Sequence, residues 1–349
     1  MKLDVVPFDP QTASRDEWAR LHAYRRLRHA ETDPDDPIID DASLETLWKR
    51  PDPQFKTLRF AVLEPDEPET QIGYVEFSVF QEDAPSYEGN EHLAQADIAL
   101  LEPQRRRGLG RELLAKVAEL AEIHGKSRLI GSSDEEDGKA FARVLGAEVA
   151  LEGMENRLAL DGVDWNMVER WANEGPQRAP SSVIHWFSNH IDDALLEDYC
   201  KFYTEVFNQQ PFGQLDVKDL VFDSDAFRDR EARVASVGGS WITALTTEEE
   251  GDISGMTEMF YLPDRETMIG QGLTGVKEEY RGRGLGKWLK AAMLLKVRDE
   301  LPQVSIVQTG NATTNEAMLS INQRLGFEKH KEGENFQITV EALQEYLGG

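Results

Sequence analysis

Two segments of the chain place apolar residues along one face of a helix. The apolar positions are Leu109, Leu113, Val117 and Leu120 in the first segment and Leu285, Leu289, Ala292 and Leu295 in the second. Spacings of three or four residues match the turn of an α-helix. The pattern therefore predicts one amphipathic helix in each half of the chain.

The same features surround both predicted helices in the same order. A glycine-rich turn opens each helix, RRRGLG at 105–110 and RGRGLG at 281–286. An extended segment precedes the turn, and a short apolar run and then a Leu-Gly pair follow the helix. These segments are 95–101, 127–130 and Leu145-Gly146 in the first copy and 271–277, 304–307 and Leu325-Gly326 in the second. A repeat this long is a domain rather than the unit of a solenoid.

The order of predicted strands and helices indicates a mixed α/β (α+β) sheet domain that occurs twice. Residues 173–182, NEGPQRAPSS, are rich in Pro, Gly and Ser, which favour turns and loops. We therefore expect a first domain at 1–177, a linker at 178–182 and a second domain at 183–349.

The composition is that of a globular protein, with 40% hydrophobic and 30% charged residues. No stretch approaches the ~20 apolar residues of a membrane span. The N-terminus is acidic and lacks the apolar core of a signal peptide. The one cysteine, Cys200, allows neither an intrachain disulfide nor a cysteine-based metal cluster. We expect a cytoplasmic protein that binds no metal.

The net charge of −27 narrows the choice of partners. A field of that sign repels nucleic acid and anionic lipid and attracts cations. We therefore expect neither a nucleic-acid nor a membrane partner. The acidity is interpreted either as a solubility surface or as an acidic site that attracts a cationic amine, and the sequence leaves both open.

A glycine-rich turn that opens a helix is suited to binding an anion. Glycines let the backbone approach closely, and the first N–H groups of the helix have no partner within it. The turns do not match a P-loop, because Lys287 is followed by Trp288 rather than Ser or Thr. They do not match a dinucleotide-binding turn either, because Leu113 and Leu289 stand at its third glycine. The remaining pattern is [QR]-x-x-G-x-[GA], which occurs once in each half.

This pattern resembles the pyrophosphate-binding motif of the GCN5-related N-acetyltransferases (GNATs). Together with QTGNATTNEAMLSINQRLGF at 308–327, it is similar to tandem-domain members related to mycothiol synthases. The resemblance implies two GNAT domains, each a mixed, mostly antiparallel sheet flanked by helices, with acetyl-CoA as the cofactor. The implied cofactor-binding residues are Arg105, Arg106, Arg107, Gly108, Leu109 and Gly110 in the first copy and Thr274, Gly275, Val276, Arg281, Gly282, Arg283, Gly284, Leu285, Gly286, Lys287, Asn311 and Asn315 in the second. For Asn315, a helix N-cap is an equal alternative.

In the resembling family, a bulged fourth strand offers backbone N–H groups to the thioester carbonyl, and the matching stretch here is 274–276. One such donor is typically worth roughly 10²–10³ in rate. Many members also place a tyrosine, as general acid, four residues before the glycine of the Leu-Gly pair. This chain has Ala142 and Asn322 at those positions, and neither side chain is a suitable proton donor.

Two further residues are candidates for chemistry in the second half. Glu258 is the candidate general base, acting through water from a strand beside the cofactor strand. The alternative is an ordinary surface glutamate at a sheet edge. Cys200 lies in an apolar helical stretch, where a small core residue is a commoner role than an acetylated nucleophile.

These observations lead to one functional hypothesis and one competitor. We expect the second copy to transfer acetyl from acetyl-CoA to a small, cationic amine by direct attack in a ternary complex. The first copy has GSSDEEDGKAF at 131–141 in place of the two asparagines, so we expect it not to catalyse. The competing hypothesis is a module that binds or senses acetyl-CoA without turnover. These patterns specify neither the acceptor nor the oligomeric state.

Overall fold

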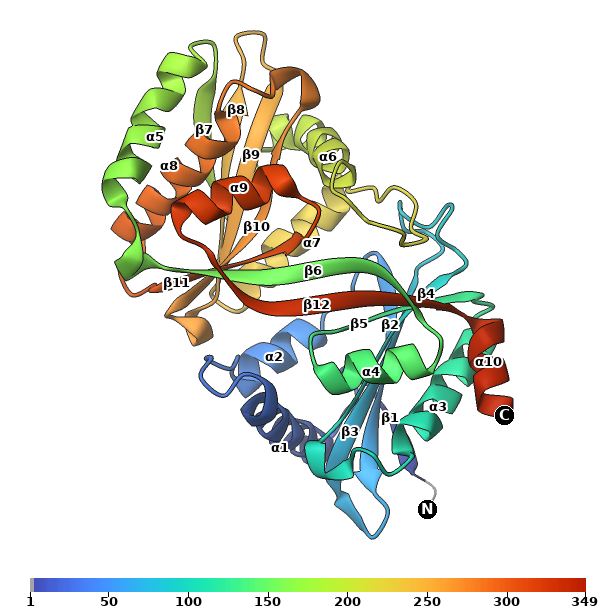
Figure 1. The fold of residues 1–349 in the computed structure, drawn as a ribbon. Coiled ribbons are helices and arrows are strands. Elements are labelled where there is room, and N and C mark those ends of the chain that lie inside the picture. The colour runs from blue at the N-terminus through green and yellow to red at the C-terminus, as the bar shows by residue number, and fades with distance from the viewer. Residues whose placement is uncertain (1–2) are drawn as a thin grey trace. The chain divides into compact units, whose positions relative to one another are not determined.

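The computed structural model describes residues 3–349, which divide into two compact units (Figure 1). Unit 1 comprises residues 1–151, 213–218 and 333–349, of which 1–2 lie outside the described part. Unit 2 comprises residues 152–212 and 219–332. Each unit contributes six neighbouring strands of a 12-stranded sheet, with helices on both faces of those strands, so the predicted repeat of an α/β domain is confirmed.

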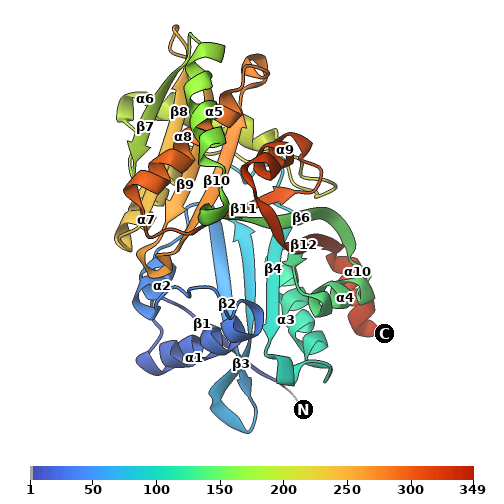
Figure 2. The ribbon, with the colours of Figure 1, turned by 60° about the vertical axis from the view of Figure 1, so that its left-hand side comes forward.

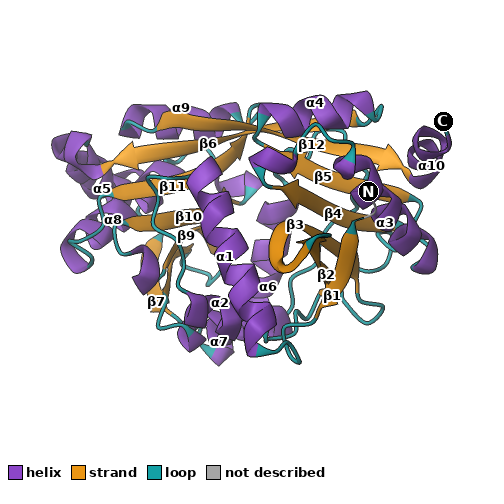
Figure 3. Cartoon of the chain, turned by 90° about the horizontal axis from the view of Figure 1, so that it is seen from below, coloured by secondary structure: helices purple, strands orange, loops and turns teal. Residues whose placement is uncertain are grey.

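In unit 1 the strand order is β1-β2-β3-β4-β5-β12. All neighbours are antiparallel except β4 and β5, which are parallel. Helix α1 lies on one face of this sheet, and α3 and α10 lie on the other (Figure 3). The elements are β1 (Asp4–Phe8), α1 (Arg15–Thr32), α2 (Asp41–Trp48), β2 (Phe55–Glu64), β3 (Glu67–Phe80), β4 (Leu93–Leu100), α3 (Leu109–Ile123), β5 (Arg128–Ser133), α4 (Glu136–Val144), β12 (Glu328–Thr339) and α10 (Val340–Gly348).

In unit 2 the strand order is β6-β11-β10-β9-β8-β7. Again one pair is parallel, β10 with β11, and the other neighbours are antiparallel. The expected mixed, mostly antiparallel sheet is therefore present twice. The elements are β6 (Glu148–Ala159), α5 (Trp165–Arg178), β7 (Val183–Ser188), α6 (Asp193–Asn208), α7 (Ser224–Ser236), β8 (Ser240–Thr247), β9 (Ile253–Tyr261), β10 (Met268–Val276), α8 (Leu285–Glu300), β11 (Ile306–Ala312) and α9 (Glu316–Leu325).

The two units exchange their last strands. Residues 153–159 of β6 follow unit 1 in the sequence but pair with β11 in unit 2. Residues 334–339 of β12 follow unit 2 in the sequence but pair with β5 in unit 1. The expected division into 1–177 and 183–349 therefore differs from the compact units, because an edge strand can complete either sheet as long as its apolar face is buried.

The segment expected to be a linker, 178–182, is instead part of unit 2. Helix α5 runs through Pro176 to Arg178, and Ala179 and Ser182 are buried. A Cβ on Gly175 would lie 2.1 Å from the Trp288 ring, so glycine lets α5 pack closely on α8 (Figure 2). Gly175 thus allows close helix packing, and Pro176 lies within α5 rather than at a break between domains.

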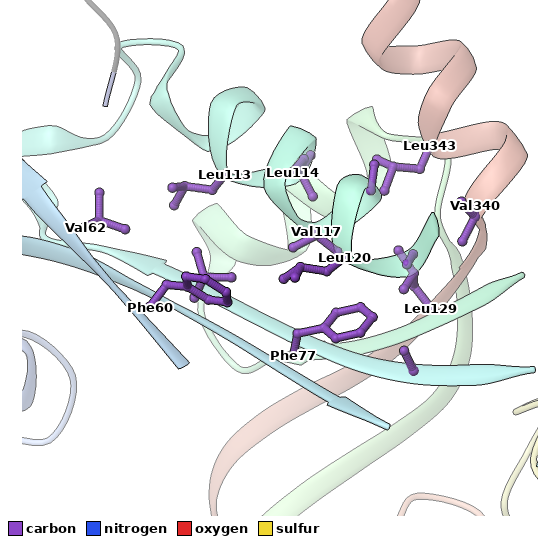
Figure 4. Close-up of a cluster of buried hydrophobic side chains, with 14 of the residues drawn as sticks. Phe60, Val62, Phe77, Leu113, Leu114, Val117, Leu120, Leu129, Val340 and Leu343 are labelled. Atoms are coloured by element: carbon purple, nitrogen blue, oxygen red, sulfur yellow. The ribbon is translucent and has the colours of Figure 1, made fainter. Parts of the chain in front are cut away.

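The two predicted helices are α3 and α8, and their apolar faces form the cores. In unit 1, Leu113 and Val117 of α3 point toward Phe60 and Phe77 of the sheet, and Leu343 of α10 covers the same cluster (Figure 4). In unit 2, the corresponding core is formed by α8, with α5 packed against it. A second core in unit 2 lies under α6 and α7 on the opposite face of the sheet.

Candidate active site

Both glycine turns open a helix with the same backbone geometry. Gly108 and Gly284 are the N-caps of α3 and α8, with φ of 82° and 87°, and neither position offers a side-chain cap. Left-handed φ values of this size favour glycine. The preceding glycine of the second turn, Gly282, has φ of 80°, whereas the matching residue of the first turn is Arg106 at 60°. A non-glycine residue in this region is strained, so the first turn holds its shape at a cost.

Each turn lies next to a place where the two parallel strands stop pairing. In unit 2, β10 and β11 pair from Met268 with Ile306 to Gln271 with Thr309, and their remaining residues pair only with the outer neighbours β9 and β6. We call the unpaired ends of β10 and β11 the fork. Unit 1 has an equivalent end of pairing after Gln95 and Ile130.

A β-bulge distinguishes the second fork from the first. The register between β9 and β10 shifts between Gln271 and Thr274, so Gly272 and Leu273 form a bulge at the start of the fork. A Cβ on Gly272 would lie 2.9 Å from Glu258, which explains the glycine. In unit 1, β3 and β4 keep one register throughout. The predicted donor stretch 274–276 pairs regularly with β9, and the bulge comes just before it.

Glu258 lies beneath this bulge and is 1% exposed. Its Oε1 accepts hydrogen bonds from Tyr203 Oη (3.0 Å) and the Leu273 amide (3.2 Å). Its Oε2 accepts one from Trp241 Nε1 (2.9 Å) and lies 3.5 Å from Arg230. The alternative of a surface glutamate at a sheet edge is therefore wrong, because β9 lies between β8 and β10.

Cationic side chains gather around the second turn. The side chain of Arg178, from α5, passes 3.5 Å from the Cβ position of Gly284. Lys287 and Arg324 both lie over the ring of Trp171. Burial, together with the fields of Arg324 and Arg178, lowers the pKa of Lys287. Like charges brought this close in an acidic protein indicate a site for an anion.

Carboxylates contact both turns, since Arg283 of the second turn lies 3.0 Å from Glu248, but they are more numerous at the first turn. Arg105 lies 3.0 Å from Glu135, 3.7 Å from Asp137 and 3.5 Å from Glu31. Arg106 also pairs with Asp137, and this pairing lowers the pKa of that carboxyl. The arginines that the sequence assigns to a cofactor thus already bind carboxylates of the same unit.

Comparisons with known proteins identify one domain by its sequence. Residues 17–147 match the model of the acetyltransferase (GNAT) family. The chain carries a GNAT domain. The second GNAT-like unit falls outside this match, and no curated protein matches the sequence.

Solved structures extend the GNAT fold to the whole chain. A tandem GNAT protein from the clavulanic acid biosynthesis pathway is 21% identical, with a TM-score of 0.77, over 97% of this chain and 99% of that one. A GCN5-related N-acetyltransferase from Sphaerobacter thermophilus is 13% identical, with a TM-score of 0.61, over 97% and 96%. N-myristoyltransferase of Saccharomyces cerevisiae, solved with bound myristoyl-CoA, is 7% identical, with a TM-score of 0.57, over 97% and 79%. The tandem GNAT fold is therefore confirmed, and the closer likeness to mycothiol synthases stays a prediction.

The asparagines expected to serve the second GNAT site have different surroundings. Asn315 is the N-cap of α9, and its side chain accepts from the Met318 amide at 3.3 Å. Asn311 lies in β11 beyond Thr309, within the fork. Asn322, at the position of the family's tyrosine, donates from Nδ2 to Asn311 Oδ1 (2.8 Å) and accepts from Lys290 Nζ (2.8 Å). Sequence reasoning missed Lys290, because a lysine on a helix usually faces solvent.

Two remaining expectations concern Cys200 and metals. Cys200 is buried in the core under α6, and burial raises the pKa of its thiol to about 11. A thiol of that kind is a poor nucleophile, which supports the structural interpretation. Residues 3–349 contain no cluster of His, Cys, Asp or Glu suited to a metal ion, and none of their helices is long and apolar enough to span a membrane.

Proposed function

We propose that this GNAT protein is an acetyl-CoA-dependent N-acetyltransferase that acts on a small amine in unit 2. The observation that carries the proposal is the bulge at Gly272 and Leu273, which lies at the start of a fork beside an open glycine turn. Unit 1 has the turn and the end of strand pairing, but its strand β4 keeps one register with β3. Acetyl transfer needs backbone donors directed at a carbonyl that gains negative charge, and a bulge can release such donors from strand pairing.

The residues around the second turn suit the diphosphate of coenzyme A. The first N–H groups of α8 have no partners within the helix, and Gly284 has no side chain to block them. Arg178, Lys287 and Arg324 would add positive charge. Acetyl-CoA, when bound, supplies an acetyl thioester with a thiolate leaving group. We propose that the fork accommodates the arm that carries this thioester.

The remaining steps belong to side chains near the fork. An amine must be neutral to attack, so a base or the solvent must take its proton. Glu258 stays the candidate base, but both of its oxygens already accept hydrogen bonds from Tyr203, Leu273 and Trp241. To act as a base it must also reach water or substrate, although it is only 1% exposed. Its contact with the Leu273 amide also supports a role in holding the bulge.

A thiol-release assay with acetyl-CoA and a panel of small amines tests the proposal. We expect the wild type to release thiol with at least one amine, Gly284→Glu to release none, and Gly108→Glu to keep most of the activity. Gly284→Asn is the matched control, because asparagine tolerates a left-handed φ without adding a carboxylate. Cofactor binding without thiol release would instead support the binding or sensing module, and loss of activity in folded Gly108→Glu would assign turnover to unit 1.

A further inference from the structure

Lys290 is a buried cation in the middle of α8. The residue is 2% exposed, and its Nζ donates to Asn322 Oδ1 at 2.8 Å. It lies 5.4 Å from the centre of the Phe327 ring, on which a cation can rest. Within residues 3–349, no carboxylate forms an ion pair with it. Buried lysines are rare unless they are paired, so this residue needs a reason other than packing.

The hydrogen bond from Lys290 continues into the fork. Asn322 accepts from Lys290 through Oδ1 and donates from Nδ2 to Asn311 Oδ1 at 2.8 Å. Asn311 lies in the part of β11 that no longer pairs with β10. With its Oδ1 engaged, Asn311 keeps Nδ2 as the group that can donate to something else. One charge in α8 therefore orients two amides, of which the second lies at the fork.

Unit 1 shows that the fold does not need this arrangement. At the position that matches Lys290, relative to the glycine turn, α3 has Leu114, which is buried in the apolar core. At the position that matches Asn322, α4 has Ala142. A lysine and an asparagine replace apolar residues only in the unit that has the bulge.

We propose that Lys290 is a positioning residue for acetyl transfer in unit 2: as an ammonium ion, it holds Asn322 and Asn311 in one orientation at the fork. This inference rests on the proposed function. A hydrogen bond from a charged donor is stronger than one from a neutral donor, and successive hydrogen bonds polarise one another. A neutral lysine can instead accept from Asn322 Nδ2, which releases the bond to Asn311. Transfer should therefore weaken when Lys290 loses its proton.

The surroundings of Lys290 set the pH range of this effect. Burial lowers the pKa of Lys290 to about 7. The groups that face it, Asn322 from α9 and the Phe327 ring, do not titrate near neutral pH. Lys287, three residues earlier in α8, and Arg324, two residues after Asn322 in α9, lie over Trp171 instead. The charge of Lys290 should thus change between about pH 6 and 8.

The test compares wild type with Lys290→Met and Lys290→Gln in the thiol-release assay from pH 6 to 9, using one amine throughout. Titration of the amine affects all three proteins equally and cancels in the ratio of their kcat values. We expect the ratio of wild type to Lys290→Met to be about tenfold or more at pH 6 and to approach one by pH 9. Lys290→Gln should follow Lys290→Met, because it restores a donor without the charge. A ratio that is close to one at pH 6, or that is constant with pH in folded variants, overturns the inference.

A second readout does not depend on turnover. The side-chain amide NMR signals of Asn311 and Asn322, assigned through Asn311→Asp and Asn322→Asp, should shift as the pH passes about 7 in wild type and stay constant in Lys290→Met. Absence of that shift in wild type overturns the inference even if the enzyme is active. If no amine causes thiol release but the NMR shift is present, the proposed function is overturned. The hydrogen-bond chain from Lys290 through Asn322 to Asn311 is then still supported.

Discussion

Units 1 and 2 repeat one glycine turn and surround it with different sets of charged side chains. In unit 1, Glu135 and Asp137 bind the arginines of the turn. In unit 2, Arg281 of the turn donates to the Val276 carbonyl and Arg178 and Lys287 lie nearby, whereas Arg283 pairs with Glu248 at 3.0 Å. The shared motif provides the same backbone N–H groups at the start of a helix. Side chains from other elements then decide whether an anion can use them.

The comparison also shows that the unit matched by the family model is not the unit with the candidate catalytic features. The GNAT family model matches residues 17–147, in unit 1, whereas the bulge and the Lys290 chain lie in unit 2. Function depends on a few site residues that the fold tolerates in many forms. We therefore assign turnover by site geometry rather than by the strength of the family match.

The largest expected effect is on cofactor binding. Gly284→Glu places a carboxylate at the N-terminus of α8, and like-charge contacts cost several kcal/mol, so affinity for coenzyme A should fall about 100-fold or more. Gly108→Glu should leave this affinity unchanged, because the first turn is already occupied by carboxylates. Calorimetry measures both variants. Equal losses of coenzyme A affinity in the two variants would show that the two turns do not differ in cofactor binding.

Exchanging the matched residues Lys290 and Leu114 should move stability in opposite directions. In Lys290→Leu, removal of the buried charge stabilises the folded state by roughly 4 kcal/mol at pH 6. The Asn322 oxygen that loses its donor destabilises it by roughly 2 kcal/mol. The free energy of unfolding should therefore rise by about 2 kcal/mol. Leu114→Lys should lower it. Urea denaturation measures both, and an unchanged stability of Lys290→Leu at pH 6 would contradict the burial argument.

The pH dependence of that gain follows from the lowered pKa. Since the pKa of Lys290 is about 7 in the folded state and about 10.4 when unfolded, the unfolded state binds more protons between those values. Wild-type stability therefore rises with pH across this window. The advantage of Lys290→Leu should shrink from pH 7 to pH 10, and an advantage that grows with pH would contradict the assignment.

A smaller effect is expected from the helix that precedes β7. Arg178→Ala removes a half-exposed cation beside Gly284, so coenzyme A should bind about 3- to 10-fold more weakly. Arg298→Ala is the matched control, because Arg298 lies in the last turn of α8 and pairs with Glu169. Titration calorimetry at one ionic strength compares them. Equal affinities of the two variants for coenzyme A would show that Arg178 of α5 does not contribute to the cofactor site.

The smallest effect concerns the acceptor. If the net charge of −27 attracts a cationic amine, the KM of the preferred amine should rise about twofold between low and physiological salt, because exposed charges more than ~8 Å apart become screened. Steady-state kinetics at two ionic strengths measures this change. A preferred acceptor that is neutral or anionic, or a KM that ignores salt, would leave the acidity as a solubility surface.

Local patterns in the sequence predicted the parts of the fold that depend on neighbouring residues. The helices α3 and α8, the glycine turns and the repeat follow from apolar spacing and from glycine's access to left-handed φ. The N-cap role of Asn315 was one of two equal interpretations, and it follows from the position of Asn315 before α9. These features need no knowledge of distant partners, and they are confirmed.

Only the tertiary structure decided the rest. The strands β6 and β12 carry no local sign of which sheet they complete, since any strand with a suitable apolar face can add to an exposed edge. The bulge depends on the register between β9 and β10. The charges around each turn come from elements far away in sequence, such as Arg178 and Glu31. Lys290 is buried because α9 and Phe327 cover it, and no periodicity along α8 encodes that contact.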